Sequence, residues 1–395
     1  MIKRKKKNKE HNPFYDPTLK KRHVSAKRFK KFTLTSLIFS VAFLAFFLFD
    51  MIGKGIPAFN IAYIKVDVTF NEKTLEDTRF AVPTPYRNLV SRAALRDLPK
   101  LLEENPTYMN STQNIWILAS SQVDQYIKNH NHNLKDKDIA IVDELYAQGL
   151  IDKKFNAIFF ENGDSKIPEY AGIFSAVIGS ILTLIITMAV AFPIGVMTAI
   201  YLEEFAGDNK FTRFIEININ NLAAIPSILF GLLGLAIFIN LFGMPRSSPL
   251  VGGLTLALMT LPIIIVSSRA ALRAVPDSIR QAGYGLGLNK IQVTRDHVLP
   301  LAFPGIMTGS IIGLAQAMGE TAPLIIIGMI AFIPDAPSMV TQAATVMPAQ
   351  LFTWAGMPEG MYIEKTAAGI LVLLTILISL NAIAIFLRKK FEVKW

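Results

Sequence analysis

Residues 266–323 read VSSRAALRAVPDSIRQAGYGLGLNKIQVTRDHVLPLAFPGIMTGSIIGLAQAMGETAP, and this stretch decides the fold. It places a polar, basic segment between two long apolar runs. A helical pattern begins after Pro276 and stops at Gly287, and a second short helical pattern ends at Leu299-Pro300. A polar helix–Gly–helix unit between two membrane spans predicts a surface on which another molecule docks from the aqueous side.

Composition indicates a membrane protein. Hydrophobic residues make up 52% of the 395 residues and charged residues 18%, against about 25% in ordinary soluble domains. The mean hydropathy is +0.39. Apolar runs recur that are long enough to cross a hydrocarbon core, and soluble cores rarely contain them. The sequence therefore predicts an all-α polytopic membrane protein and argues against a large soluble helical protein.

The net charge of +10 is concentrated at one end of the chain. Residues 1–31 contain thirteen Lys or Arg and two acidic residues, so the rest of the chain carries −1. A nucleic-acid-binding protein would distribute basic residues over a folded face, and we expect no nucleic-acid partner. We interpret residues 1–31 as a basic cytoplasmic tail, disordered on its own, that touches anionic membrane lipid.

The chain contains no cysteine, which excludes disulfides, thiolate metal sites and a cysteine nucleophile. His130 and His132 form a close pair in a polar stretch. Neither a carboxylate nor a third histidine stands at ligand spacing from this pair. We therefore expect an exposed loop there and no metal site.

The N-terminal part predicts one span followed by an extracytoplasmic domain. Residues 32–52 form the first apolar run, and no small-residue cleavage pattern follows it, so we expect a transmembrane helix. Residues 53–170 mix charges, prolines and short apolar stretches, which predicts a small α+β insert. We expect strands over Ile61–Phe70 and Asn156–Phe160, and an amphipathic helix over Asn88–Glu104. The insert shows no catalytic constellation, and its role stays open.

Residues 171–390 predict a membrane core with five further spans. These are Ala171–Leu202, Leu222–Phe242, Leu250–Val266, Phe303–Phe332 and Thr366–Leu387. We expect a kink at Pro193 in the first of them. A polar loop is predicted over Glu203–Asn221. The mixed loop over Ile333–Glu364 carries Trp354 and Tyr362, which we expect to be interfacial anchors.

Six spans place both chain ends on the same side of the membrane. The predicted cytoplasmic loop, residues 267–301, contains five Lys or Arg, whereas residues 333–364 contain none. This asymmetry agrees with the positive-inside rule, so we expect cytoplasmic termini and an extracytoplasmic insert.

The loop over residues 267–301 has the local signals of a compact helical unit. Pro276 sets φ for a helix start, and Asp277 or Ser278 can cap the first turn. Gly287 is placed to end that helix in the left-handed conformation. These signals also fit a plain basic loop, and the residues alone leave both interpretations open.

One face of the predicted helix is suited to contact with another protein. Ile279, Ala282 and Leu286 share that face at helical spacing. The run Gln281-Ala282-Gly283 has small or slender side chains, so a partner surface could approach closely.

This loop resembles that of the permease subunits of ABC importers, whose pattern is Glu-Ala-Ala, three residues, Gly, nine residues, Ile-x-Leu-Pro. The chain has Gln281-Ala282-Gly283, Gly287 and His297-Val298-Leu299-Pro300 at that spacing. In the family this loop is the coupling helix that seats on an ATPase subunit. The resemblance therefore implies ATPase docking, whereas Gln281 in place of the acid argues against a salt bridge at that point.

The flanks of the loop narrow the resemblance to PstA-type permeases of phosphate ABC importers. The similar segments are Leu272–Pro276 (LRAVP), Pro304–Gly309 (PGIMTG) and Gly319–Pro323 (GETAP), and the likeness runs from about Ala171 to the C-terminus. It implies the six-helix fold of type I ABC importer permeases, in a branch with a large extracytoplasmic insert. It also implies a bacterial plasma (inner) membrane location.

The resemblance further implies a set of partners. They are a PstC-type permease, two ATPase subunits and an extracytoplasmic phosphate-binding protein. No Gly-x-x-x-x-Gly-Lys-Ser/Thr run occurs in the chain, so ATP and Mg²⁺ are expected on the partner ATPase. We expect no cofactor on this chain and no enzymatic activity of its own.

Glu320 is the leading candidate for a pathway or gating residue, together with its neighbours Thr321 and Pro323. A carboxyl group is costly to bury in a membrane and marks a functional position by default. Phosphate is an anion, which an ionised carboxylate would repel. We therefore expect Glu320 to pair with an arginine or a partner-subunit cation, or to gate while protonated.

Two departures from the family pattern concern the anion path. Many members carry arginines where this chain has Gln316 and Val266. If those arginines contact the anion in relatives, Arg269 or Arg273 would have to take that role here.

Two other functions remain open at the level of the sequence. One is an ABC permease for another oxyanion or small solute. The other is a receptor-like membrane protein that senses a ligand with its insert, although a sensor has no need of an ATPase-docking loop.

Overall fold

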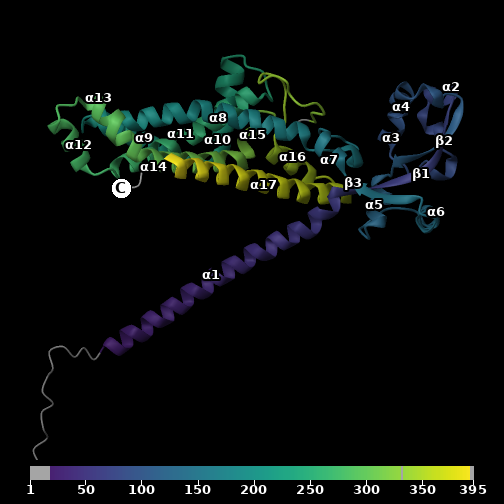
Figure 1. Ribbon diagram of the computed structural model, residues 1–395, viewed down its shortest axis with the longest axis horizontal. Coiled ribbons are helices and arrows are strands. Elements are labelled where there is room, and N and C mark those ends of the chain that lie inside the picture. Colours follow the sequence, from purple (N-terminus) through teal and green to yellow (C-terminus); the bar gives the residue numbers. More distant parts are fainter. Residues whose placement is uncertain (1–17, 331, 392–395) are drawn as a thin grey trace, which may run out of the picture. The chain divides into compact units, whose positions relative to one another are not determined.

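The computed structural model describes residues 18–330 and 332–391. The chain divides into two compact units after Gly53, and Figure 1 shows the elements of both. In the first unit, α1 (Leu19–Gly55) contains the whole predicted first span. The expected disorder is wrong for residues 19–31, which are helical, whereas residues 1–17 lie outside the described residues. Lys and Arg are good helix formers, so the apolar helix extends through the basic stretch.

A three-stranded antiparallel sheet forms the centre of the insert. It consists of β1 (Asn60–Phe70), β2 (Ser111–Leu118) and β3 (Ile151–Phe155), in the order β2-β1-β3. Ile64 of the central strand lies opposite Ile117 on one side and Ile151 on the other, and all three are buried. The predicted strand over residues 61–70 is confirmed, and its alternation places apolar side chains in one core.

Short helices surround the sheet. They are α2 (Glu72–Glu76), α3 (Arg92–Arg96), α4 (Leu98–Glu104), α5 (Ser121–Ile127), α6 (Asp136–Ala147) and α7 (Ala157–Glu161). The 3₁₀ turns are η1 (Ile56–Phe59), η2 (Thr78–Ala81), η3 (Thr84–Tyr86), η4 (Pro106–Tyr108) and η5 (Pro168–Tyr170).

Two predictions for the insert are wrong. The single helix expected over residues 88–104 is divided into α3 and α4, because Pro99 lies in the first turn of α4 and starts a new helix. The strand expected over residues 156–160 is α7. The Asn156 side chain accepts a hydrogen bond from the Phe159 backbone N–H at 3.2 Å, which caps a helix at this point.

Four long helices form the membrane core. They are α8 (Phe174–Ile200), α11 (Pro249–Arg273), α14 (Leu299–Gly319) and α17 (Gly360–Phe391). α11 packs against α8 and α14, and α14 also packs against α17 (Figure 1). Glycine permits the closest approach of α8 and α11: a Cβ on Gly253 would lie 2.6 Å from Cβ of Ile186. Pro193 lies inside α8, and the kink expected there stays a prediction.

The region between α8 and α11 differs from the prediction. The polar loop expected over residues 203–221 contains a π-helical turn, η6 (Tyr201–Phe205), and a helix, α9 (Lys210–Leu222). The Asn209 side chain caps α9 by accepting from the Thr212 N–H at 2.9 Å. The predicted span over residues 222–242 is α10 (Ser227–Gly234) followed by π-helical η7 (Leu235–Leu241).

The number of spans depends on how this bent pair is counted. Within residues 18–330 and 332–391, five helices are long and apolar enough to cross a membrane. Residues 210–222 and 227–241 pass the same test as a pair, with a bend of 103° between them. Counting the pair as one broken span gives six. The predicted mostly helical, multi-pass architecture with a small sheet is thus confirmed.

The predicted span over residues 303–332 is interrupted. α14 ends at Gly319, Glu320 has extended backbone angles, and α15 (Ala322–Ile326) begins after Thr321. Pro323 lies in the first turn of α15, where its missing N–H costs nothing. The GETAP run is therefore a break between two helices.

The segment over residues 333–364 is more ordered than the expected loop. It contains α16 (Met347–Ala355) and the start of α17. The expected interfacial exposure of Trp354 and Tyr362 is wrong, because both side chains are buried. Trp354 Nε1 donates to Asp164 Oδ1 at 2.8 Å, and the Tyr362 hydroxyl donates to the Ser165 carbonyl at 2.6 Å.

Buried charges at the start of α17 join the insert to the membrane core. Lys128 Nζ lies 3.1 Å from Glu364 Oε2 and 2.6 Å from Asp124 Oδ2. The next residue, Lys365, is 1% exposed. Its ammonium donates to three backbone carbonyls, those of Pro168, Glu169 and Ala171. Hydrogen bonding thus satisfies a lysine that would otherwise be costly to bury.

Candidate functional site: the α11–α14 loop and the break at Glu320

The loop between α11 and α14 is a compact helical hairpin, shorter than predicted. α11 continues to Arg273, and α12 (Asp277–Gly285) begins after Pro276. α13 (Lys290–Val293) follows and continues through π-helical η8 (Thr294–Val298) into α14. The predicted helix end at Leu299-Pro300 is wrong, since both residues lie in the first turn of α14.

The N-terminus of α12 lacks the expected side-chain cap. The N-cap residue is Pro276, and neither Asp277 nor Ser278 caps a backbone N–H. The Asp277 carboxylate instead lies 3.3 Å from Arg280 Nη1, one turn later. A carboxylate in the first turn also interacts favourably with the helix dipole.

α12 ends at Gly285, and Gly287 terminates it in the left-handed conformation, as the sequence predicted. Gly287 has φ +81°, and its N–H donates to the Tyr284 carbonyl at 2.9 Å. The N–H of Leu288 donates to the Gly283 carbonyl at 3.2 Å. These two bonds form a Schellman motif, which requires a left-handed residue at the position of Gly287.

Gly283 has a different role from the one expected. Its Cα faces α13, and a Cβ there would lie 2.8 Å from Cγ2 of Val293. Both residues are buried. The small size of Gly283 therefore serves the packing of α12 on α13. α13 is held by a capping box in which the Asn289 and Gln292 side chains bond to each other's backbone N–H at 2.9 Å.

α12, η8 and the start of α14 together line a largely apolar groove of about 340 Å³. Its lining residues are Ile279, Ala282, Gly283, Leu286, Asp296, His297, Pro300 and Leu301. Leu286 is 79% exposed, although it is a large apolar side chain. Ala282 is exposed as well, whereas Ile279 is half-buried against the core, so two of the three residues of the expected apolar face are exposed in this chain.

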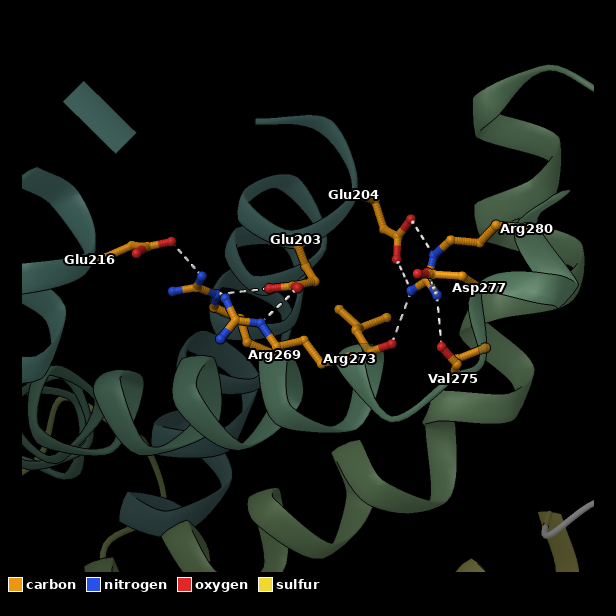
Figure 2. Close-up of polar contacts among 9 residues, drawn as sticks. Glu203, Glu204, Glu216, Arg269, Arg273, Val275, Asp277 and Arg280 are labelled. Atoms are coloured by element: carbon orange, nitrogen blue, oxygen red, sulfur yellow. Dashed lines mark hydrogen bonds and ion pairs between the residues drawn. The ribbon is translucent and has the colours of Figure 1, made fainter. Parts of the chain in front are cut away.

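An ion-pair network fastens the hairpin to the ends of α8 and α11 (Figure 2). Glu204, in the π-helical turn after α8, accepts from Arg280 Nη2 at 2.6 Å. Arg280 also donates to the carbonyls of Val275 at 2.8 Å and Leu272 at 3.0 Å, at the end of α11. The hydrogen bond to Glu204 raises the pKa of the Arg280 guanidinium above its ordinary value. One side chain of α12 therefore contacts two other helix ends.

Arg269 and Arg273 belong to the same network. Arg269 Nε lies 3.3 Å and Arg273 Nε 2.7 Å from the two carboxylate oxygens of Glu203, and Arg269 also pairs with Glu216 of α9 (Figure 2). Arg269 uses Nε and Nη2 in these ion pairs, whereas Arg273 uses only Nε, so the glutamates offset the charge of both guanidinium groups and leave the Nη groups of Arg273 without a partner among the described residues. The glutamate partners of these arginines were not predicted from the sequence, although the pair Glu203-Glu204 at the end of an apolar run could have indicated them.

Glu320 lies half-buried in the break between α14 and α15. Its carboxylate makes no hydrogen bond or ion pair with any residue of the described ranges, so the expected pairing with an arginine does not occur within them. Gln316, one turn earlier, is exposed, and Thr321 is half-buried. The break and the α11–α14 hairpin lie at opposite ends of α14, so they are two separate candidate sites.

The break packs against the other interrupted helix of the core. A Cβ on Gly231 of α10 would lie 2.7 Å from Cα of Pro323. Irregular backbone at membrane depth is tolerated only where protein covers it or where it lines a cavity. An uncompensated carboxyl beside such backbone is the arrangement expected of a pathway or gate residue.

Two known protein families match parts of this chain. The sequence model of the family described as "Binding-protein-dependent transport system inner membrane component" matches residues 191–393. A second family, described as a domain of unknown function (DUF3333), matches residues 16–85 and 81–136.

Curated relatives match mainly the membrane core. "Phosphate transport system permease protein PstA" of Mycobacterium leprae (strain TN) is 36% identical over 160 residues, 40% of this chain and 52% of that protein. The protein of the same name from Yersinia pestis is 31% identical over 245 residues, 61% of this chain and 81% of that protein. The chain thus spans about half the length of the first relative.

A solved structure of the "MetNI methionine ABC transporter" in inward-facing conformations is 16% identical. It covers 56% of this chain and 98% of its own, with a TM-score of 0.45. The family match alone takes in just over half of the chain, from the middle of α8 onward, and includes both the α11–α14 hairpin and the break at Glu320. This chain therefore belongs to the family of binding-protein-dependent transport system inner membrane components.

Proposed function

We propose that this chain is the permease subunit of an ATP-driven phosphate importer, in which it forms half of the translocation pathway. The observation that carries the proposal is the α11–α14 hairpin, called the α12 hairpin below, in which Gly287 terminates α12 and which presents an exposed apolar groove. Such a groove is suited to a protein partner. The names of the relatives support phosphate as the substrate.

The proposed complex contains three kinds of partner. A PstC-type permease completes the pathway, a pair of ATPase subunits docks on the α12 hairpins, and a phosphate-binding protein delivers the substrate. ATP and Mg²⁺ belong to the ATPase, because this chain has no phosphate-binding Gly-x-x-x-x-Gly-Lys-Ser/Thr loop. The chain itself is then a non-catalytic subunit.

The geometry supports a route for the coupling motion. ATP binding closes the ATPase pair and displaces α12. Arg280 transmits that displacement, because it bonds to Glu204 after α8 and to two carbonyls at the end of α11. Both helices then shift relative to the partner permease, and the pathway opens to the other side. Glu320 serves this cycle as a gate, paired with a partner-subunit cation or protonated.

The proposed topology follows from charge and span number. With six spans, residues 1–31 and the C-terminus lie in the cytoplasm with the loop of residues 267–301. The insert, residues 53–170, is then a domain on the extracytoplasmic side, and residues 171–390 are the permease core of a bacterial plasma membrane protein.

Uptake of labelled phosphate by cells depleted of this protein tests the proposal. The two test variants are Gly287→Val and Gly285→Val. Gly287 needs φ +81°, which a β-branched residue rarely adopts, whereas Gly285 has ordinary angles and open space around it. We expect Gly287→Val to lose both uptake and capture of the ATPase, and Gly285→Val to retain both.

The same uptake assay distinguishes an error in the proposed substrate from an error in the proposed mechanism. Glu320→Gln should still capture the ATPase and yet import less phosphate, because the gate and not the docking surface is changed. If depletion leaves phosphate uptake unaffected, phosphate is not the substrate. If the uptake of another oxyanion falls instead, that oxyanion is the substrate. An ATPase that binds Gly287→Val as well as wild type would overturn the docking surface.

A further inference from the structure

All four arginines of the insert line one groove. Residues 53–170 contain fourteen basic residues, of which four are arginines: Arg79, Arg87, Arg92 and Arg96. The groove has a volume of about 660 Å³, and its other lining residues are Asp77, Thr78, Phe80, Asn88 and Leu95. None of the lysines whose side chains the structure describes lines it. The insert has more acidic than basic residues, sixteen against fourteen, so the positive charge is a local feature.

The fold brings these arginines together from separate elements. Arg79 lies in η2, which the Asp77 side chain caps by accepting from the Arg79 N–H at 3.1 Å. Arg87 follows η3, and Arg92 and Arg96 lie one turn apart on α3. The buried residues beneath this surface belong to the hydrophobic core of the insert, and they include Ala81, Val82, Leu89 and Leu95. The elements that carry the arginines are therefore anchored in the hydrophobic core of the insert.

Most of the positive charge in the groove is not neutralised within the chain. Asp77 pairs with Arg79, with Oδ2 at 2.6 Å from Nη2. Arg87 Nε donates to the Val82 carbonyl at 3.0 Å, and its guanidinium lies 4.8 Å from the Phe80 ring centroid. These contacts orient Arg87 without cancelling its charge. The side chains of Arg92 and Arg96 have no ion-pair or hydrogen-bond partner among the described residues.

Four guanidinium groups thus face one carboxylate in a single groove. Like charges one helical turn apart, as on α3, destabilise a short helix. A ligand that supplies the missing negative charge would remove this repulsion. The preference for arginine over lysine points to phosphate or carboxylate, because a guanidinium binds planar pairs of oxygens with two parallel hydrogen bonds.

Charge and volume together select the class of ligand. One phosphate group carries about −1.5 to −2 at neutral pH, which is less than the three charges left in the groove. The groove is also of the size that holds a small organic ligand, about 300–1,000 Å³. We propose that the arginine groove of the insert binds an oxyanion with two or more phosphate groups. This site is separate from the α12 hairpin and from Glu320, and it does not rest on the transport proposal.

The test is binding of pyrophosphate to the full-length chain in lipid nanodiscs, measured by calorimetry at constant ionic strength. The double variant Arg92→Gln/Arg96→Gln should weaken binding by about tenfold or more, since it removes two charged donors. Arg92→Lys/Arg96→Lys should fall between the double glutamine variant and wild type. Lys135→Gln/Lys137→Gln removes two exposed charges of the same domain, and it should leave binding unchanged.

A second measurement locates the ligand. Phenylglyoxal modifies accessible arginines, and mass spectrometry identifies the modified positions. Pyrophosphate should protect Arg92 and Arg96 and leave Arg213, which is 71% exposed at its side chain, fully reactive. The transport-defective Gly287→Val variant should show the same protection, so failure of the groove and failure of the permease proposal give different results.

Three outcomes would overturn the inference. If Arg92→Gln/Arg96→Gln and Lys135→Gln/Lys137→Gln lose binding equally, the domain attracts anions nonspecifically. Equal affinity for pyrophosphate, inorganic phosphate and sulfate would exclude selection of a ligand with several phosphate groups. Absence of anion binding together with capture of an acidic protein by this groove would assign it to a protein interface instead.

Discussion

At the scale of single residues, the ion pairs near α12 differ in burial and therefore in energetic weight. In the Arg280–Glu204 pair the two side chains are 16% and 4% exposed. In the Arg295–Asp296 pair of the same loop they are 70% and 45% exposed. An exposed pair contributes about 0–1 kcal/mol, whereas removal of one partner of a buried pair leaves an uncompensated charge in the protein.

Arg280→Gln should therefore lower the free energy of unfolding by about 3 kcal/mol, and Arg295→Gln by less than about 1 kcal/mol. The measurement is detergent-induced unfolding of the purified chain. The double variant Glu204→Gln/Arg280→Gln should cost less than the two single changes added together, because no buried charge is then left alone. Equal costs for Arg280→Gln and Arg295→Gln would show that the Arg280–Glu204 pair is solvated.

At the scale of elements, α9 has two different sides. Glu216 contacts Arg269 and Ile219 is buried, so one side faces the protein. Phe211, Phe214 and Ile217 are 70%, 63% and 53% exposed. A short amphipathic helix that exposes large apolar residues beside membrane spans is suited to the interface of a bilayer, so we expect α9 to be the interfacial part of the broken span and α10 with η7 its crossing part.

Environment-sensitive fluorophores on single cysteines can test this position of α9, and the cysteine-free chain needs no prior substitution. A label on Phe214→Cys should show blue-shifted emission and strong quenching by nitroxide-bearing lipids. A label on Asn220→Cys, which is exposed on another side of the helix, should emit as in water. Water-like emission from both positions would place α9 away from the bilayer, and blue-shifted emission from both would place all of α9 inside it.

Local signals made several of these elements predictable. The apolar runs indicated the long helices, and Gly287 indicated the end of α12, because only a glycine adopts its backbone angles without strain. The strand over residues 61–70 followed from β-branched residues in alternation. These features depend on neighbours in the sequence.

Other features depend on tertiary contacts that no short stretch reveals. The strand expected over residues 156–160 is a helix because the Asn156 side chain caps it. Gly283 looked accessible, yet α13 covers it. Trp354 resembled an interfacial anchor, but Asp164, far away in sequence, accepts its N–H. The glutamates that hold Arg269 and Arg273 come from a region that was expected to be a loop.

At the scale of the whole molecule, the proposed topology places the insert and the α12 hairpin on opposite sides of the membrane. Lys100→Cys and Arg295→Cys provide reporters, since the side chains they replace are 79% and 70% exposed. On intact cells, a membrane-impermeant maleimide should label Lys100→Cys and leave Arg295→Cys unlabelled until the cells are opened. The parent chain gives no background. Labelling of both positions on intact cells would contradict the topology.

The buried charges at the start of α17 have a consequence for biogenesis. A ribosome completes the insert long before it makes Glu364 and Lys365. The groups that satisfy these two residues, among them Lys128 and the carbonyls of Pro168 and Ala171, are therefore already present when the last span emerges. The insert therefore provides the binding partners for the first turns of α17. The start of α17 therefore reaches its final place only when residues made much earlier are in position to receive its two charges.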